Sequence, residues 1–474
     1  MSNNNSKKIL GVYTLTMINV AAILSLRNLP VMAELGWASI FFYLLSGIVF
    51  FIPSALVSAE LATGWATTGG VYTWVKAAYG KKWGFVAIWM QWVENLFWYP
   101  AVLSFTGATI AYLIDPSLAE NKYYILTVIF LLYWACTFVN YFGMELSGLL
   151  SSTGVMLGTL IPGAFLILLG LLWVISGHPL EIPFSKEALI PDMSSVQNVV
   201  FLVGVMLGFA GMEMSAVHAR EVENPQRDYP RAIFFATIII LVLSVLGSLA
   251  IAFVVPQSEI SLVAGIMQAM KALLARFGLS WMMPIFAVMI SFGAISMVST
   301  WIIGPSKGLF QTAHEGLLPP LFHKRNRFGM PSSILIGQGI VVSLFSLAFL
   351  FMPTVSSSYW ILTDLTAMLY LIMYILMFMA AIRLRYTHPE VERAYRIPGG
   401  KNWGMWCVAG TGLIASIASV IIGFVPPAQL DTGDLLTFEL FLGIGMVVMT
   451  AIPLVIYMLH RKEWELAVEE ETNV

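Results

Sequence analysis

Twelve long apolar segments divide this chain, and they constrain its fold more than any other feature. Each has about 20 or more mostly apolar residues, the length that an α-helix needs to cross a bilayer. Only 11% of the 474 residues are charged, whereas a soluble domain carries about 25%. The sequence therefore predicts an all-α polytopic membrane protein with twelve transmembrane helices. The approximate spans are 9–33, 37–60, 83–114, 123–142, 147–176, 196–219, 231–256, 280–305, 332–352, 359–385, 403–425 and 435–460.

Lysine and arginine are distributed unevenly over the connections between these spans. If the N-terminus is cytoplasmic, the connections on the outer side contain only Lys122, Lys186, Lys271 and Arg276. Apart from Arg27, which falls inside a span, all the other cations then lie on the inner side. Cytoplasmic connections are enriched in these residues. We therefore expect a cell (inner) membrane protein with both termini in the cytoplasm.

The chain has no motif that predicts a cofactor or an enzymatic reaction. Cys136 and Cys407 lie inside apolar segments far apart, so we expect free thiols and no metal site. The glycine pairs at 69–70 and 399–400 lack the Lys-Ser/Thr that follows in a phosphate-binding loop. The expected partners are the lipid bilayer and a small molecule, with no nucleic acid. A monomer and a homodimer both remain open.

Two of the predicted spans are interrupted by residues that do not suit a plain membrane helix. In span 1, the stretch 19–30 contains the permanent cation of Arg27 and the helix breaker Pro30. In span 6, the stretch 207–213 contains two glycines and the carboxylate of Glu213. Irregular backbone at membrane depth is tolerated where it lines a cavity or is buried in protein. Close helix packing at the glycines is the alternative explanation.

The positions of the two interruptions predict an internal repeat. They are five spans apart, and an odd offset inverts the second unit relative to the first. We therefore expect two inverted five-helix repeats, 9–176 and 196–385, followed by two extra helices in 403–460. Interrupted helices in corresponding positions of two repeats indicate a transporter binding site.

The interrupted helices predict which ligand such a site would bind. The N-terminal end of a half-helix suits a carboxylate, and unwound carbonyl groups suit an ammonium group. Two antiparallel broken helices offer both, which fits a zwitterionic α-amino acid. The candidate substrate-binding residues at the two breaks are Ala22, Ser25, Arg27, Phe209, Ala210 and Gly211.

The buried cation of Arg27 needs a countercharge, because an unpaired buried charge is strongly destabilising. Glu94 in the middle of span 3 and Asp364 early in span 10 are the candidate partners. We expect Arg27 to pair with one of them in the empty protein and to line or border the substrate cavity. Arg27 then either holds the side-chain carboxylate of an acidic substrate or forms a static structural pair.

Four further residues could have a functional or a structural role. For two of them both roles remain open, and for the other two we expect a structural role. Glu213 is either a gating group that exchanges a proton as the site opens or a cap for freed backbone amides. Trp301 closes span 8 and is either a lid over the cavity or an interfacial anchor. Glu60 ends span 2, where we expect interfacial solvation. Trp98 on span 3 is more typical of packing than of a binding site.

Several motifs resemble those of the amino acid–polyamine–organocation (APC) superfamily of transporters. They are Thr68-Gly69-Gly70-Val71-Tyr72-Thr73-Trp74, Gly211-Met212-Glu213-Met214-Ser215-Ala216 and Glu223-Asn224-Pro225-Gln226-Arg227-Asp228-Tyr229-Pro230. The segments 302–308 and 396–401 resemble, more narrowly, the bacterial glutamate/γ-aminobutyrate antiporter family. The resemblance implies the LeuT-type fold, alternating access, and amino acid exchange. Proton-coupled uptake is the alternative, and a non-transporting sensor or a channel is a more distant one.

The resemblance also assigns roles to single residues. Glu213 and Trp301 match the family's gating glutamate and gate tryptophan. Leu207 stands where many members have an aromatic residue above the substrate, and Met297 replaces a glutamate, so we add both to the candidate site. Arg27 stands where the glutamate exchangers have a tyrosine. The resemblance therefore implies an exchanger of this type with an altered pocket.

Overall fold

A computed structural model describes residues 11–65, 69–142, 153–191, 194–215, 222–400, 402–461 and 464, and their regular elements are all helices. Nine helical stretches in these residues are long and apolar enough to cross a membrane. Three predicted spans are not among the nine. Two of them are the interrupted spans 1 and 6. The third is a continuous helix of 31 residues with Gln91, Glu94 and Asn95 at its middle.

The helices follow the predicted spans closely. Their bounds are α1 Val12–Ile23, α2 Leu29–Ala33, α3 Ser39–Ser46, α4 Ile52–Gly64, α5 Val71–Tyr79, α6 Lys81–Ala111, α7 Lys122–Tyr141, α9 Ile161–Ile175, α10 Phe201–Gly208, α11 Met212–Ser215, α12 Pro225–Ala252, α13 Gly265–Arg276, α14 Met283–His314, α15 Ser332–Ser346, α16 Ala348–Phe351, α17 Val355–Thr387, α18 Trp403–Ile422 and α19 Leu435–Met458. The connecting helices α5 and α13 were not predicted, because each is a short helix between two spans.

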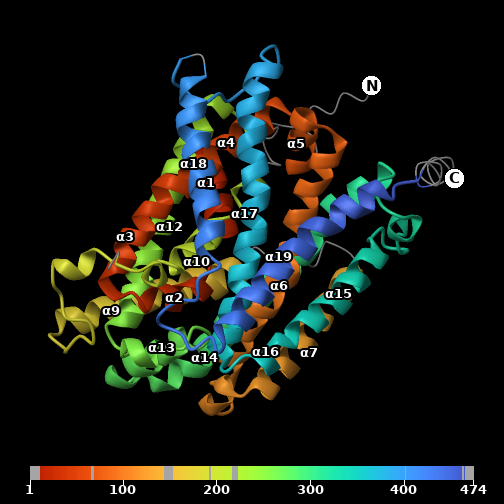
Figure 1. The fold of residues 1–474 in the computed structure, drawn as a ribbon. Coiled ribbons are helices and arrows are strands. Elements are labelled where there is room, and N and C mark those ends of the chain that lie inside the picture. The colour runs from red at the N-terminus through yellow and green to blue at the C-terminus, as the bar shows by residue number, and fades with distance from the viewer. Residues whose placement is uncertain are drawn as a thin grey trace.

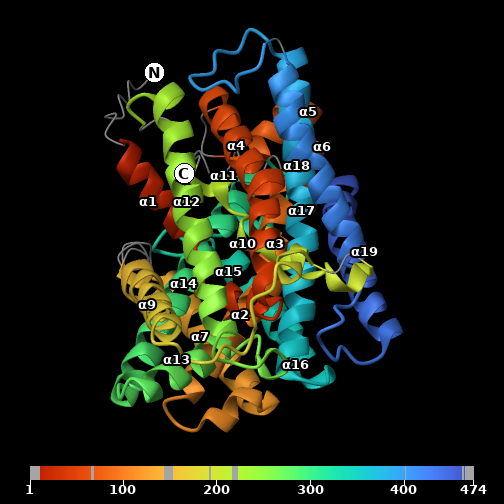
Figure 2. The same cartoon turned by 90° about the vertical axis from the view of Figure 1, so that its left-hand side faces the viewer.

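Helices α6 and α17 form the centre of the bundle. They share the most extensive helix–helix contact in the described structure. Helix α17 runs along most of the length of the bundle (Figure 1). Most side chains of both helices are buried. A helix that is apolar on all sides is one that other helices surround. On another side of the bundle, α12 packs against α1, α3 and α4 (Figure 2).

Both predicted interruptions are present. Helix α1 ends at Ile23, and Leu24 and Ser25 are extended before a short 3₁₀ turn leads into α2. Pro30 lies in the first turn of α2, where its missing N–H costs no helical hydrogen bond. Helix α10 ends at Gly208, and α11 begins at Met212. Between them, Gly211 has a φ of 117°, a conformation that favours glycine.

The expectation that Glu60 is solvated at the membrane interface is wrong. Its side chain is buried against Arg385 and Arg393. The segment after α17 folds back over the end of α4, so that Tyr395 donates its backbone N–H to the hydroxyl of Thr63. This tertiary contact covers the carboxylate, and residue-by-residue reading of span 2 does not reveal it.

Candidate functional site

A central cavity lies where the two interrupted helices meet α6, α14 and α17. Its volume is about 40 Å³ in this conformation, which leaves room for only a few water molecules. Its walls contain the break of α1, the break of α10 and the middle of α6, which supplies three polar or aromatic side chains. The lining residues are Ile23, Ser25, Arg27, Asn28, Glu94, Asn95, Trp98, Leu207, Gly208, Ala210, Met297, Trp301 and Tyr370.

Arg27 enters this cavity as a buried cation, with 3% of its surface exposed. Its Nε and Nη1 atoms have no hydrogen-bond partner among the residues that the structure describes. The Cζ atom lies 5.8 Å from the ring centre of Trp98 and 5.6 Å from that of Tyr359. These distances allow cation–π attraction, which partly offsets the lost hydration of the guanidinium. Two nitrogens of the Arg27 guanidinium are therefore buried without a hydrogen-bond partner in the described structure.

The predicted ion pair of Arg27 is not formed in this conformation. Among the described residues, no carboxylate oxygen lies within 4.0 Å of the Arg27 nitrogens. Asp364 faces α18 instead, because a Cβ atom added to Gly423 would lie only 2.9 Å from its Oδ1 atom. Tyr359, which contacts Arg27, is five residues before Asp364, and that spacing places the two about 140° apart around α17. Asp364 therefore lies outside the cavity.

Glu94 does line the cavity with Arg27, but its carboxylate is engaged locally. Its Oε1 atom accepts a hydrogen bond from the side-chain amide of Asn95 at 2.5 Å. Glu94 is 2% exposed and Arg27 3% exposed. The structure thus brings a cation without an ion-pair partner and a carboxyl group to the wall of one cavity.

The aromatic wall consists of Trp98 and Trp301, whose ring centres are 5.7 Å apart. The hydroxyl of Tyr99 donates to the backbone carbonyl of Trp301 at 2.8 Å, which fixes this part of α14 against α6. Met297, one helical turn before Trp301, lines the same space. Trp98, which we expected to pack rather than to bind, also lines the cavity, and its ring lies beside Arg27.

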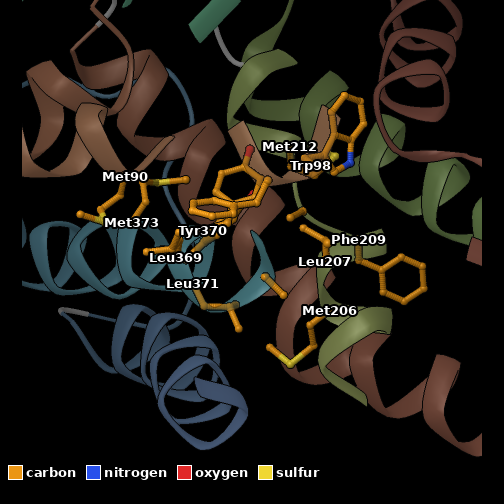
Figure 3. Packing of buried hydrophobic residues seen from close by; sticks show 14 of the residues in the cluster. Met90, Trp98, Met206, Leu207, Phe209, Met212, Leu369, Tyr370, Leu371 and Met373 are labelled. Carbon is orange, nitrogen blue, oxygen red and sulfur yellow. The ribbon is translucent and has the colours of Figure 1, made fainter. Parts of the chain in front are cut away.

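The predicted residues of the α10 break line two different cavities. Leu207 and Ala210 line the central cavity, as Ser25 of the α1 break does. Phe209 lines a neighbouring cavity of about 20 Å³ and packs against Tyr43, with ring centres 5.9 Å apart. In Figure 3 its side chain points away from Tyr370.

Gly211 and Ala22 are the other two predicted residues of the breaks. The backbone N–H of Gly211 donates to the hydroxyl of Tyr374 at 2.7 Å. The side chain of Ala22 lies outside the part of the chain that the structure describes.

Glu213 sits between the central cavity and a second, larger space. Its carboxylate accepts hydrogen bonds from the hydroxyls of Tyr370 and Tyr374 and from the amide of Gln91, the last at 2.9 Å. Tyr370 belongs to the wall of the central cavity, whereas Gln91 and Glu213 line the second space. The carboxylate is thus part of the partition between the two.

The second space is a vestibule of about 360 Å³, lined in part by the start of α5, and α5 lies at one end of the molecule (Figure 1). Exposed cations, Lys307 and Arg325, form part of its outer wall. The guanidinium of Arg325 lies over the ring of Phe310, 4.7 Å from its centre. In the described residues, no cluster of three or more His, Cys, Asp or Glu side chains could hold a metal ion.

The cavity contains residues that the sequence did not propose for substrate binding, namely Asn28, Asn95, Trp98 and Tyr370. For α6 a signal existed, because Glu94 and Trp98 are four residues apart and therefore share a helix face. For Tyr370 no such signal exists, since only the packing of α17 against α6 brings it to the site.

Comparisons with known proteins agree on the kind of molecule. The profile of the amino acid permease family matches residues 10–451. An uncharacterized transporter of Legionella pneumophila is 46% identical over 450 residues, which cover 95% of this chain and 97% of that protein. The glutamate/gamma-aminobutyrate antiporter of Lactococcus lactis subsp. lactis is 34% identical over 474 residues, which cover 98% of this chain and 93% of that protein.

A comparison with solved structures identifies the fold. The crystal structure of MhsT in complex with L-phenylalanine, a LeuT-fold protein, has a TM-score of 0.56 to this chain at 16% identity. The match covers 86% of this chain and 97% of MhsT. At this identity the likeness bears on the fold alone.

Proposed function

Because this chain belongs to the amino acid permease family and is a transporter rather than an enzyme, we propose that it exchanges amino acids across the membrane by alternating access. The observation that carries the proposal is the central cavity, where the breaks of two interrupted helices meet the buried cation of Arg27, which forms no ion pair within the described structure. The antiporter of Lactococcus lactis, at 34% identity over nearly the whole chain, supports exchange in particular. If Arg27 alters the pocket, the substrate of this chain differs from that of the Lactococcus lactis antiporter.

The membrane arrangement that goes with this function has twelve spans. Two inverted five-helix repeats, 9–176 and 196–385, precede two further helices in 403–460. The surplus of lysine and arginine on one side favours cytoplasmic termini in the cell (inner) membrane. The vestibule lies on that same side, so we assign this conformation to the inward-facing half of the cycle.

Several of the predicted site residues have a proposed task in that cycle. Ser25, Ala210 and the backbone at the two breaks bind the amino and carboxylate groups of the substrate. Met297 and Leu207 shape the space around its side chain. Trp301 closes over the cargo, and Glu213 opens and closes the partition toward the vestibule.

Counterflow into proteoliposomes tests the proposal. Liposomes containing the purified protein are loaded with an unlabelled amino acid, and the entry of the labelled amino acid is measured. An exchanger accumulates label only when the lumen is loaded. Uptake into empty liposomes that requires a proton gradient would instead support a proton-coupled symporter. Saturable binding without any flux would contradict transport itself.

A further inference from the structure

Helix α17 is buried along most of its length, but one face of its C-terminal half is open. Met379 is 38% exposed, and Arg383 and Tyr386 are exposed as well. Further back along the helix, Ile372 and Leu376 are only partly buried. The alternating spacing of four and three residues places all five on one side of an α-helix. We call these five residues the α17 strip, which is apolar over its first three members and polar at its end.

Arg383, in the polar part of the strip, is held by an aromatic ring. Its Cζ atom lies 4.7 Å from the ring centre of Tyr79, at the end of α5. The hydroxyl of Tyr79 in turn donates to the backbone carbonyl of Met379 at 3.2 Å. Among the described residues, no carboxylate oxygen lies within 4.0 Å of an Arg383 nitrogen. Because a guanidinium that contacts a ring still presents its N–H donors in its own plane, Arg383 is positioned without being neutralised.

Two lysines lie close to this arginine. Lys81 and Lys82 follow Tyr79 across Gly80, and both are exposed. Consecutive Cα atoms are about 3.8 Å apart, so both lysines start within about 12 Å of Tyr79. The ammonium group of Lys82 lies 5.6 Å from the ring centre of Trp83, which is also exposed. Neither lysine forms an ion pair within the described part of the chain, so three cations gather at the end of the strip.

This surface has the polarity of a phospholipid. Helix α17 is long and apolar enough to cross a membrane, so the apolar part of its strip faces acyl chains and the polar end faces headgroups. Tyrosine and tryptophan are enriched at that depth. An arginine can bind a phosphate group through two parallel hydrogen bonds. A cluster of cations beside a membrane helix attracts lipids with a net negative charge.

We propose that the α17 strip binds one anionic phospholipid, with its phosphate at Arg383 and an acyl chain along Ile372, Leu376 and Met379. Lys81 and Lys82 attract the net charge of the headgroup, and Tyr79 positions the guanidinium. A free phosphate ion has the charge but gains nothing from the apolar part of the strip. The proposal requires a membrane-spanning protein and does not depend on what the protein transports.

Thermal unfolding of the purified full chain in detergent tests the site, because a ligand of the folded state raises its apparent stability. Dioleoyl phosphatidylglycerol, dioleoyl phosphatidylcholine and inorganic phosphate are titrated separately. We expect phosphatidylglycerol to bind about tenfold more tightly than phosphatidylcholine or better, and inorganic phosphate to stabilise little at the same concentration. Arg383→Gln should weaken the binding of phosphatidylglycerol about fivefold, the factor that one cation near an anionic membrane surface contributes.

Arg327→Gln is the matched control. Arg327 is another exposed arginine beside an aromatic ring, 4.8 Å from the centre of Phe328, and it lies outside the strip. This variant should bind phosphatidylglycerol as the wild type does. Lys82→Gln is a second variant of the site and decides the matter if Arg383→Gln does not fold, since it should also weaken this binding.

Three results would overturn the proposal. The first is equal binding of the two lipids by the wild type, which is expected if the three glutamates at 469–471 or a second copy of the chain cover the strip. The second is stabilisation by inorganic phosphate as strong as that by phosphatidylglycerol, which would indicate a site for a free anion. The third is binding of phosphatidylglycerol that is unchanged in the folded variants of the strip or reduced equally in Arg327→Gln.

Discussion

Arg385 donates two parallel hydrogen bonds to Glu60, from Nε to Oε1 and from Nη2 to Oε2, each at 2.6 Å. Both side chains are at most 2% exposed. The remaining capacity of the carboxylate is taken by the backbone N–H of Ile397 at 2.8 Å and by Arg393, whose Nε lies 3.4 Å from Oε1. The pair fastens α17 to the end of α4.

Breaking this pair should destabilise the protein strongly. Arg385→Gln removes the two hydrogen bonds that Arg385 donates to the buried carboxylate of Glu60. Removing one member of a buried ion pair costs about 3–5 kcal/mol of stability. Lys76→Gln is the control, because the Lys76–Glu315 pair is 34% and 26% exposed and such pairs contribute about 1 kcal/mol or less. Denaturant unfolding in detergent measures both. Equal losses for the two variants would contradict the assigned role.

The Glu60 pair also marks what the sequence could and could not predict. Gly208, Gly211 and Pro30 identify both helix interruptions, because these residue types act on the local backbone. The burial of Glu60 depends on a segment more than 300 residues away in the chain, so no local pattern reveals it. For the same reason Arg27 was recognisable as anomalous, whereas its aromatic neighbour Tyr359 was not.

Trp301→Ala should weaken substrate binding about tenfold, since an aromatic contact in a closed site contributes roughly 0.5–1.5 kcal/mol beyond its buried area. Trp406→Ala removes an indole on α18 that is 48% exposed, and it should leave affinity unchanged. Binding titrations of both variants with the same amino acid decide this. Unchanged affinity in Trp301→Ala would return Trp301 to the role of an interfacial anchor.

Glu213→Gln should slow exchange by about tenfold or more while leaving substrate binding near the wild-type level. Glu213 lies in the partition and outside the cavity wall. Its carboxyl group accepts hydrogen bonds from the hydroxyls of Tyr370 and Tyr374, and a glutamine amide cannot ionise and has only one oxygen to accept them. Exchange rate and affinity are measured separately, in proteoliposomes and by thermal shift. A variant that loses binding and rate together would place Glu213 in the substrate site instead.

Glu34, in the connection between α2 and α3, predicts a pH dependence of stability. Burial raises the pKa of its carboxyl from 4.5 to about 8. The folded state therefore holds this proton more tightly than the unfolded state. The contribution of protonated Glu34 to the free energy of unfolding is complete below pH 4.5 and is lost as the pH rises toward 8. Each pKa unit corresponds to about 1.4 kcal/mol.

Thermal unfolding between pH 5 and pH 8 measures this effect. Glu34→Gln should flatten the decline in stability, whereas Glu187→Gln, at an exposed position on a neighbouring connection, should preserve it. A decline that persists unchanged in Glu34→Gln would assign the pH dependence to other groups.

The most direct measurement of the central claim is substrate protection of a cysteine in the cavity. Replacing Cys136 and Cys407 by serine removes both native thiols, and Ser25→Cys then places a single thiol at the break of α1, in the cavity wall. If the cavity is the transport site, a membrane-impermeant thiol reagent blocks exchange in this variant, and bound amino acid slows the labelling. Labelling that substrate does not slow, with exchange continuing after complete modification, would contradict it.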